Sequence, residues 1–267
     1  MNIILGAIFS IGTLFLLMSI FKGVGLDMLL NTNALLIIFG GITVALFVGF
    51  PSQRILNAAY DIIAAFKDRR DREVLIKDIL DIARIYRKAD IRNLESRIPR
   101  IDDDFLRLGV NLLINHNSND DIRSIMEREM MIRLVNYNLS QNILKTVARL
   151  APSLGLAGTI ISLISMFKNF QSVDTIAPLM SIALMSTFYG VIISNLFALP
   201  LCAKLKEKAI ISETLMNLTI EGILAVNTME HPLKIKDRLS GRNDFLEIGL
   251  QRVKDKLPLA DASSISQ

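Results

Sequence analysis

The sequence predicts an all-α polytopic membrane protein with four transmembrane helices and a helical cytoplasmic domain between the second and the third. Three observations predict this fold class. First, 51% of the 267 residues are hydrophobic and mean hydropathy is +0.43, although 21% are charged, so charge must be segregated along the chain. Second, four apolar stretches (residues 3–21, 34–50, 150–167 and 176–203) approach the ~20 residues that cross a bilayer. Third, the charged segments show apolar residues at helical spacing, without the alternation of strands.

The first two apolar stretches define a predicted membrane segment, residues 1–50. The stretch 3–21 has no Lys or Arg ahead of its apolar run, which a secretory signal peptide would have, so we expect a retained membrane helix. The stretch 34–50 is short and would span with help from its flanks. Only Lys22 and Asp27 are charged in the loop between them.

Residues 51–146 are predicted to form the helical cytoplasmic domain. Apolar residues recur at helical spacing from Val74 to Ile85, and Pro99 interrupts the pattern. Asp120 or Asp121 suits the N-cap of a long helix that could continue into the third span. This segment and the one after residue 204 are dense in Lys and Arg, so the positive-inside rule places both, and both termini, in the cytoplasm.

The last two apolar stretches, within residues 147–203, do not have the composition of simple anchors. They contain Thr159 and Thr187, glycines and serines at helical spacing, and Pro152 and Pro200 at their outer ends. Small residues let helix backbones approach closely, and hydroxyls form hydrogen bonds with backbone, ions or water where bulk water is absent. The pair is therefore predicted to face other helices or an ion path.

None of the four stretches contains Asp or Glu in its interior. Because cation movement through a membrane normally uses an intramembrane carboxylate, an ion-conducting role would require that carboxylate from another chain. This chain would then line the path with Thr159, Thr187, Ser186 and Tyr189. The alternative is structural: membrane threonines commonly bond to carbonyls of their own helix, and the prolines could simply begin, end or kink a helix.

Other functional classes find no support in the sequence. It has no nucleophile triad, phosphate-binding loop or metal-ligand spacing, so we expect neither an enzyme nor a resident cofactor or metal. The pI near 9.2 is read as an orientation signal, since no motif interleaves basic and aromatic residues for nucleic acid. Residues 204–257 are predicted to be a helical cytoplasmic region, and residues 258–267 a disordered tail.

Four sequence blocks carry a family resemblance that runs from the first span to about Leu239. They are LLIIFGGITVAL in the second span, RKADIRNLES in the insert, APSLGLAGT with STFYGVIISNLFALPLCAKL in the last pair, and IEGILAVNTMEHPLKIKDRL after it. Together they resemble MotA, the ion-channel subunit of the bacterial flagellar stator, including its sodium-type relatives called PomA, within the MotA/TolQ/ExbB superfamily. The last block and the two prolines are the most specific.

The resemblance implies a homopentamer in the bacterial inner membrane around two copies of a single-span, peptidoglycan-binding partner, MotB, which supplies the membrane aspartate. The transported ion would be Na⁺ or H⁺. Pro152 and Pro200 would couple ion binding to movement of the cytoplasmic domain. Arg87, Lys88 and Glu95 would contact the rotor protein FliG, although such charges usually form only a solvated face.

Three alternatives remain open from sequence. TolQ and ExbB proteins are similar around Gly158 and Thr159, but have three spans and lack the EGILA block. A gliding or defence motor of the same superfamily is the second. A membrane scaffold that moves no ions is the third, and it predicts little effect from replacing either threonine by valine. Tyr189 and Asn195 resemble the sodium-type stators, so sodium is favoured over the proton.

Overall fold

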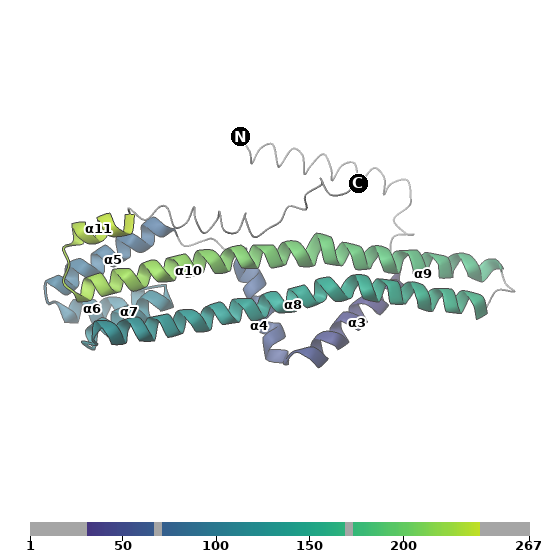
Figure 1. The fold of residues 1–267 in the computed structure, drawn as a ribbon, viewed down its shortest axis with the longest axis horizontal. Coiled ribbons are helices and arrows are strands. Elements are labelled where there is room, and N and C mark those ends of the chain that lie inside the picture. Colours follow the sequence, from purple (N-terminus) through teal and green to yellow (C-terminus); the bar gives the residue numbers. More distant parts are fainter. Residues whose placement is uncertain (1–30, 67–70, 169–172, 241–267) are drawn as a thin grey trace, which may run out of the picture. The chain divides into compact units, whose positions relative to one another are not determined.

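The computed structural model describes residues 31–66, 71–168 and 173–240 (Figure 1). Its helices are α3 (Thr32–Gly49), α4 (Ser52–Ala65), α5 (Arg72–Arg87), α6 (Ile91–Arg97), a 3₁₀ turn (Ile98–Arg100), α7 (Asp104–Ile114), α8 (Asn119–Lys168), α9 (Val173–Ile192), a π-helix (Ile193–Ala198), α10 (Leu199–Asn227) and α11 (Pro232–Ser240). Within these ranges no residue belongs to a β-strand, and the all-α prediction is confirmed. The predicted first span, 3–21, and the predicted tail, 258–267, lie outside the described residues.

The chain divides into two compact units. Among the described residues, one comprises 31–58, 140–168 and 173–203, and the other 59–66, 71–139 and 204–240. We call them the membrane unit and the charged unit. The helices α4, α8 and α10 each contribute residues to both units.

Three helical segments among the described residues are long and apolar enough to cross a membrane: Thr32–Gly49, part of Asn119–Lys168 and part of Ile176–Asn227. They correspond to the predicted second, third and fourth spans. Only 17–22% of the most apolar window of each is buried inside the chain. Most of these apolar side chains are therefore left uncovered by the described residues, as expected of helices that face lipid or other membrane helices.

A small apolar core joins the helices of the membrane unit. Ile38 and Ile42 of α3 are buried together with Ala151 of α8, and Tyr189 and Leu154 pack against them. The helix α3 begins at a side-chain cap, in which the Asn31 side chain accepts a hydrogen bond from the Ala34 N–H (3.1 Å). It ends before Pro51, which disfavours helical backbone in the preceding residue.

The short helices of the charged unit start at aspartates. The side chains of Asp71, Asp90 and Asp103 accept hydrogen bonds from first-turn N–H groups of α5, α6 and α7. A carboxylate there both satisfies an otherwise unpaired donor and complements the positive end of the helix dipole. These caps fix where each helix begins.

The helices α5, α6, α7 and α11 gather around the start of α8 and the end of α10 (Figure 1). Their inward faces share one apolar core, which is the reason they fold as a unit. The largest fully buried side chains in it are Leu75, Ile79, Leu94, Phe105, Leu106, Leu113, Ile122, Met126, Ile223 and Ile235.

The long helix α8 confirms that one helix runs through the predicted insert into the third span, but its cap differs from the prediction. The Asp121 N–H donates to Ser118 Oγ (3.1 Å), and the Ser118 hydroxyl donates to Asp121 Oδ2 (2.6 Å). Ser118 is therefore the cap, and Asp121 belongs to the first turn. The Ser118 hydroxyl thus satisfies the N–H of the third helical residue, which is the role of an N-cap side chain.

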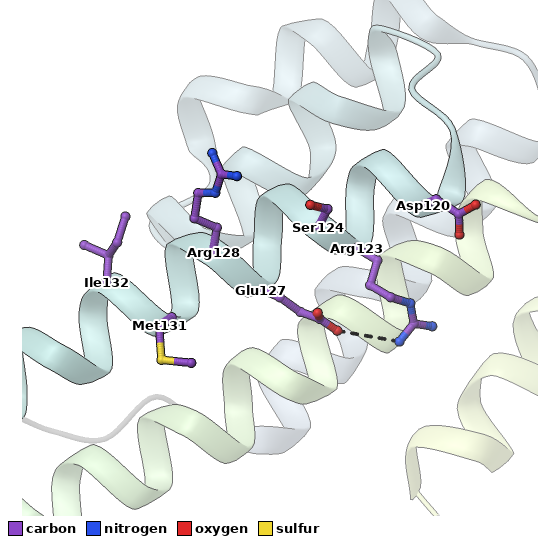
Figure 2. Close-up of a pocket in the computed structure, with 7 residues that line it drawn as sticks. All are labelled: Asp120, Arg123, Ser124, Glu127, Arg128, Met131 and Ile132. Atoms are coloured by element: carbon purple, nitrogen blue, oxygen red, sulfur yellow. Dashed lines mark ion pairs between the residues drawn. The ribbon is translucent and has the colours of Figure 1, made fainter.

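A shallow depression lies on the surface of α8 in the charged unit (Figure 2). It is lined by Asp120, Arg123, Ser124, Glu127, Arg128, Met131 and Ile132. The closest opposite charges in it are Arg123 Nη1 and Glu127 Oε1, 3.7 Å apart and exposed. Because all the lining residues come from one helix, this depression is a feature of the helix surface and no candidate for an ion path.

Candidate functional site

Glycines set the distance between α8 and α9 in the membrane unit. A Cβ atom added at Gly190 would lie 2.5 Å from the Ala151 carbonyl oxygen, and one at Gly155 would lie 2.7 Å from the Ser186 carbonyl oxygen. At Gly158 it would lie 2.7 Å from the Ser186 side chain. Real Cβ contacts are not this short, so a side chain at any of these positions would push the helices apart. The two helices are antiparallel and in backbone contact, as small residues allow within a membrane.

The close approach brings Thr159 and Thr187 together. Their Oγ1 atoms are 2.6 Å apart, and Thr159 Oγ1 also lies 3.1 Å from the Gly155 carbonyl and 3.0 Å from the Ala183 carbonyl. Each hydroxyl has one proton, so one threonine donates to the other, whose own proton goes to a carbonyl or to a ligand. Thr187 is exposed on the surface of the chain and Thr159 is half-buried. The pair therefore offers adjacent hydroxyl oxygens on one wall of the helix pair, although Thr159 also back-bonds within its own helix.

The structure places the other two predicted lining residues differently. Ser186 is fully buried, and its hydroxyl donates to the Ile182 carbonyl of the same helix (2.8 Å). The Tyr189 hydroxyl accepts the Asn31 N–H at the start of α3 (3.0 Å). Ser186 thus sits beneath Gly155 and Gly158 in the helix contact, and Tyr189 ties α9 to α3.

Pro152 lies in the interior of α8, far from its first residue, Asn119, and not near a helix start. Proline has no N–H, so it cannot bond to the Ala148 carbonyl four residues earlier. The Ser194 hydroxyl donates to that carbonyl instead, at 2.7 Å, and both residues are buried. Ser194 was not among the predicted residues. Its signal in the sequence is indirect: an interior proline implies a carbonyl that needs a donor from elsewhere.

Pro200 does not end the helix of the fourth span. The π-helix Ile193–Ala198 precedes it, and α10 continues to Asn227. In the π-helix, the Leu199 N–H donates to the Ser194 carbonyl, five residues earlier. Such segments insert one residue into an α-helix and are frequent at functional sites. Both predicted prolines therefore lie at irregularities of long helices.

Arg87, Lys88 and Glu95 lie on a corner of the charged unit. Arg87 is the last residue of α5, Lys88 caps that helix, and Glu95 lies on α6. Ala89, with φ 55°, makes the turn between the two helices. All three charged side chains are exposed, and none takes part in an ion pair among the described residues. They are available to a partner.

Two further groups of the charged unit have shifted pKa values. Burial lowers the pKa of Lys208, against the opposing effect of the Asp61 charge, and the Lys208 ammonium donates to the Ala64 carbonyl near the end of α4. Burial raises the pKa of Tyr137, and its hydrogen bond with Ser212 opposes that shift. Both belong to the packing of this unit rather than to the threonine pair.

Comparison with known proteins identifies the family of this helix pair. Residues 97–217 match the MotA/TolQ/ExbB proton channel family, and this range includes Pro152, the threonine pair and Pro200. Over this range the chain contains a domain of the MotA/TolQ/ExbB proton channel family. Arg87, Lys88 and Glu95 lie just before the matched range.

Known proteins are similar to this chain over most of its length. Motility protein A of Treponema pallidum is 29% identical over 213 residues, which cover 79% of this chain and 82% of that protein. Chemotaxis protein PomA of Vibrio alginolyticus is 26% identical, covering 85% and 90%. A solved structure of the flagellar MotAB stator complex from Bacillus subtilis superposes with a TM-score of 0.75 at 28% identity, covering 88% of this chain and 93% of that chain.

Proposed function

We propose that this chain is an ion-conducting stator subunit of a bacterial flagellar motor, which couples cation flow to torque on the rotor. The observation that carries the proposal is the threonine pair Thr159–Thr187 on a glycine-packed helix pair whose apolar stretches contain no carboxylate. The family match over residues 97–217 and the similarity to motility protein A support it. The chain would form one wall of an ion path and would be inactive alone.

The missing carboxylate defines the partner. A MotB-like subunit with one membrane span and a peptidoglycan-binding domain would supply an aspartate opposite Thr159 and Thr187, which together we call the threonine wall. Similarity to the chain in the Bacillus subtilis MotAB complex supports such a partner. We infer five copies of this chain around two partners, in the inner membrane with both termini in the cytoplasm. Arg87, Lys88 and Glu95 would face FliG on the rotor.

The partner's carboxylate, the threonine hydroxyls and the two prolines would each have a different role in ion transport. The partner's carboxylate would supply the charge that makes a cation or proton tolerable at low dielectric. The threonine hydroxyls would replace part of the hydration shell through their oxygen lone pairs, as pore-lining oxygens do in channels. Pro152 and Pro200, at the irregular points of α8 and of the fourth span, would convert occupancy of the site into helix movement.

The transported ion is proposed to be sodium, with the proton as the alternative, because Tyr189 and Asn195 resemble the sodium-type stators. Swimming speed in a host that depends on this chain would be measured with sodium removed at a fixed membrane potential. Sodium coupling predicts that the cells stop. Unchanged speed would refute sodium coupling and leave the proton as the alternative.

Replacement of Thr159 tests the proposal itself. In a strain that lacks its own stator, the variant Thr159→Val keeps the shape of the side chain and removes the hydroxyl, whereas Thr159→Ser keeps the hydroxyl. We expect Thr159→Val to abolish torque at normal membrane levels, and Thr159→Ser to retain most of it. Normal swimming by both Thr159→Val and Thr187→Val would identify the chain as a scaffold that moves no ions.

A further inference from the structure

The carbonyl of Ala148 is the one that Pro152 leaves without its helical donor. In an α-helix each carbonyl accepts the N–H of the residue four positions later, and here that residue has none. Ala148 is 7% exposed and Ala151 is fully buried, so water has little access to this turn. A buried carbonyl of this kind needs another donor.

Ser194 supplies that donor from the fourth span. Its hydroxyl is 4% exposed and donates to the Ala148 carbonyl at 2.7 Å. By contrast, the hydroxyls of Ser165 and Ser186 donate to carbonyls four residues earlier in their own helices. Gly190, one turn before Ser194, has no side chain and therefore lets the two backbones come close enough for this contact.

The same serine also belongs to the π-helix. Its carbonyl accepts the Leu199 N–H five residues later, where a regular α-helix would use Ala198. Pro200 cannot donate to the Leu196 carbonyl, which lies inside the π-helix. The two prolines are therefore joined through one residue, because the hydroxyl of Ser194 fills the gap made by Pro152 and its carbonyl takes part in the irregular segment before Pro200.

We propose that Ser194 is a positioning residue of the stator cycle, which holds the bend of α8 at Pro152 in register with the π-helix of the fourth span. The inference rests on the proposed function for its consequence in torque, but its hydrogen bond can be tested without it. When the π-helix changes register, Ser194 moves, the Ala148 carbonyl loses its donor, and α8 is free to change its bend at Pro152. Movement of either helix is thereby transmitted to the other.

A double-mutant cycle on the purified full-length complex tests the hydrogen bond. Ser194→Ala should raise the unfolding equilibrium constant at least about fivefold, because it leaves a buried carbonyl unpaired. In a Pro152→Ala background, the new Ala N–H can bond to Ala148, so the same change should cost less than about twofold. Ser186→Ala, which removes only a bond within its own helix, is the matched control.

The outcomes of the cycle decide the pairing. An equal cost of Ser194→Ala in both backgrounds overturns it. If Ser194→Ala prevents accumulation of the complex in the parent background but permits it in the Pro152→Ala background, the pairing is supported. Failure of the complex to accumulate in both backgrounds overturns it. Ser194→Thr, which keeps a hydroxyl, should behave as the parent chain.

Torque steps separate positioning from plain stability. In a bead assay, Ser194→Ala should reduce the speed increment per incorporated stator unit by at least about half, and Ser194→Thr should restore it. A merely structural serine would lower the number of units and leave each increment unchanged, and that result overturns the positioning role. If the parent chain drives no motor at all, the proposed function is wrong, but the double-mutant cycle still shows whether Ser194 bonds to the Ala148 carbonyl.

Discussion

Replacing Gly190 by alanine should separate α8 from α9. The added Cβ would lie 2.5 Å from the Ala151 carbonyl oxygen, about 0.9 Å inside the 3.4 Å at which ordinary van der Waals contact begins. It would also lie 3.2 Å from the Pro152 Cα. Both obstacles are backbone atoms, so no side-chain rotation can relieve the overlap, and one helix must shift by most of that distance.

The expected cost is that of an overpacked core, about 1–3 kcal/mol of unfolding free energy. A shift of this size also lengthens the 2.6 Å contact between Thr159 and Thr187 to at most about 3.5 Å, past the usual range of an O–H···O hydrogen bond. Stability and torque should therefore fall together in Gly190→Ala. Torque should fall more steeply, because the threonine wall loses its geometry before the helices unfold.

Two glycines of α3 provide matched controls. A Cβ at Gly40 would meet no atom of the described residues within 4 Å, so Gly40→Ala should be neutral or slightly stabilising. At Gly41 it would meet only the flexible end of the Leu154 side chain, at 2.7 Å, which predicts an intermediate cost. Thermal unfolding of the purified complex would rank the three variants. The reasoning fails if Gly190→Ala is as stable as Gly40→Ala.

Further predictions concern the charged unit. Charge reversal by Arg87→Glu with Lys88→Glu, or by Glu95→Lys, should impair swimming at normal levels of the complex, because these side chains are exposed and carry no ion pair among the described residues. Reversal of the opposite charges on the rotor should restore swimming. An unaffected motor would show that these residues do not belong to the rotor interface. Burial raises the pKa of Tyr137 above 10.0, so the stability contributed by its protonated phenol is intact below pH 10.0 and is lost as pH rises through the folded-state pKa. Tyr137→Phe should therefore reduce the fall of the denaturation midpoint at alkaline pH. An unchanged dependence of the midpoint on pH would contradict this role of Tyr137. Phe105 is 1% exposed, and the Arg133 guanidinium lies 5.4 Å from the centre of its ring. Phe105→Ala should therefore lower the free energy of unfolding by about 3–5 kcal/mol in a denaturant titration. A loss below about 1 kcal/mol would show that neighbouring side chains had filled the cavity.

The sequence predicts the architecture well because its strongest signals are long. Hydropathy locates the second, third and fourth spans, and helical periodicity locates α5 and the passage of α8 into the membrane. Local chemistry is less visible. Asp121 resembles a cap until Ser118 is considered beside it, and Pro152 resembles a helix start until its place inside α8 is known.

The candidate site was predicted in part. The threonine pair follows from polar residues placed in apolar helices, and the structure brings their hydroxyls together. The locations of Ser186 and Tyr189 depend on which face of α9 meets α8 and α3, which helical spacing alone does not determine. The sequence does not predict Ser194, because its role depends on a carbonyl in a different helix, forty-six residues away, that lacks its helical donor.

The most direct test of the central claim uses the partner's carboxylate. Motor rotation would be recorded in cells that make this chain alone, with the single-span protein that copurifies with it, or with a form of that protein whose membrane aspartate is replaced by asparagine. The chain as one wall of an ion path predicts rotation only with the intact aspartate, and its loss when Thr159→Val is introduced. Rotation without any membrane carboxylate in the partner would contradict the account.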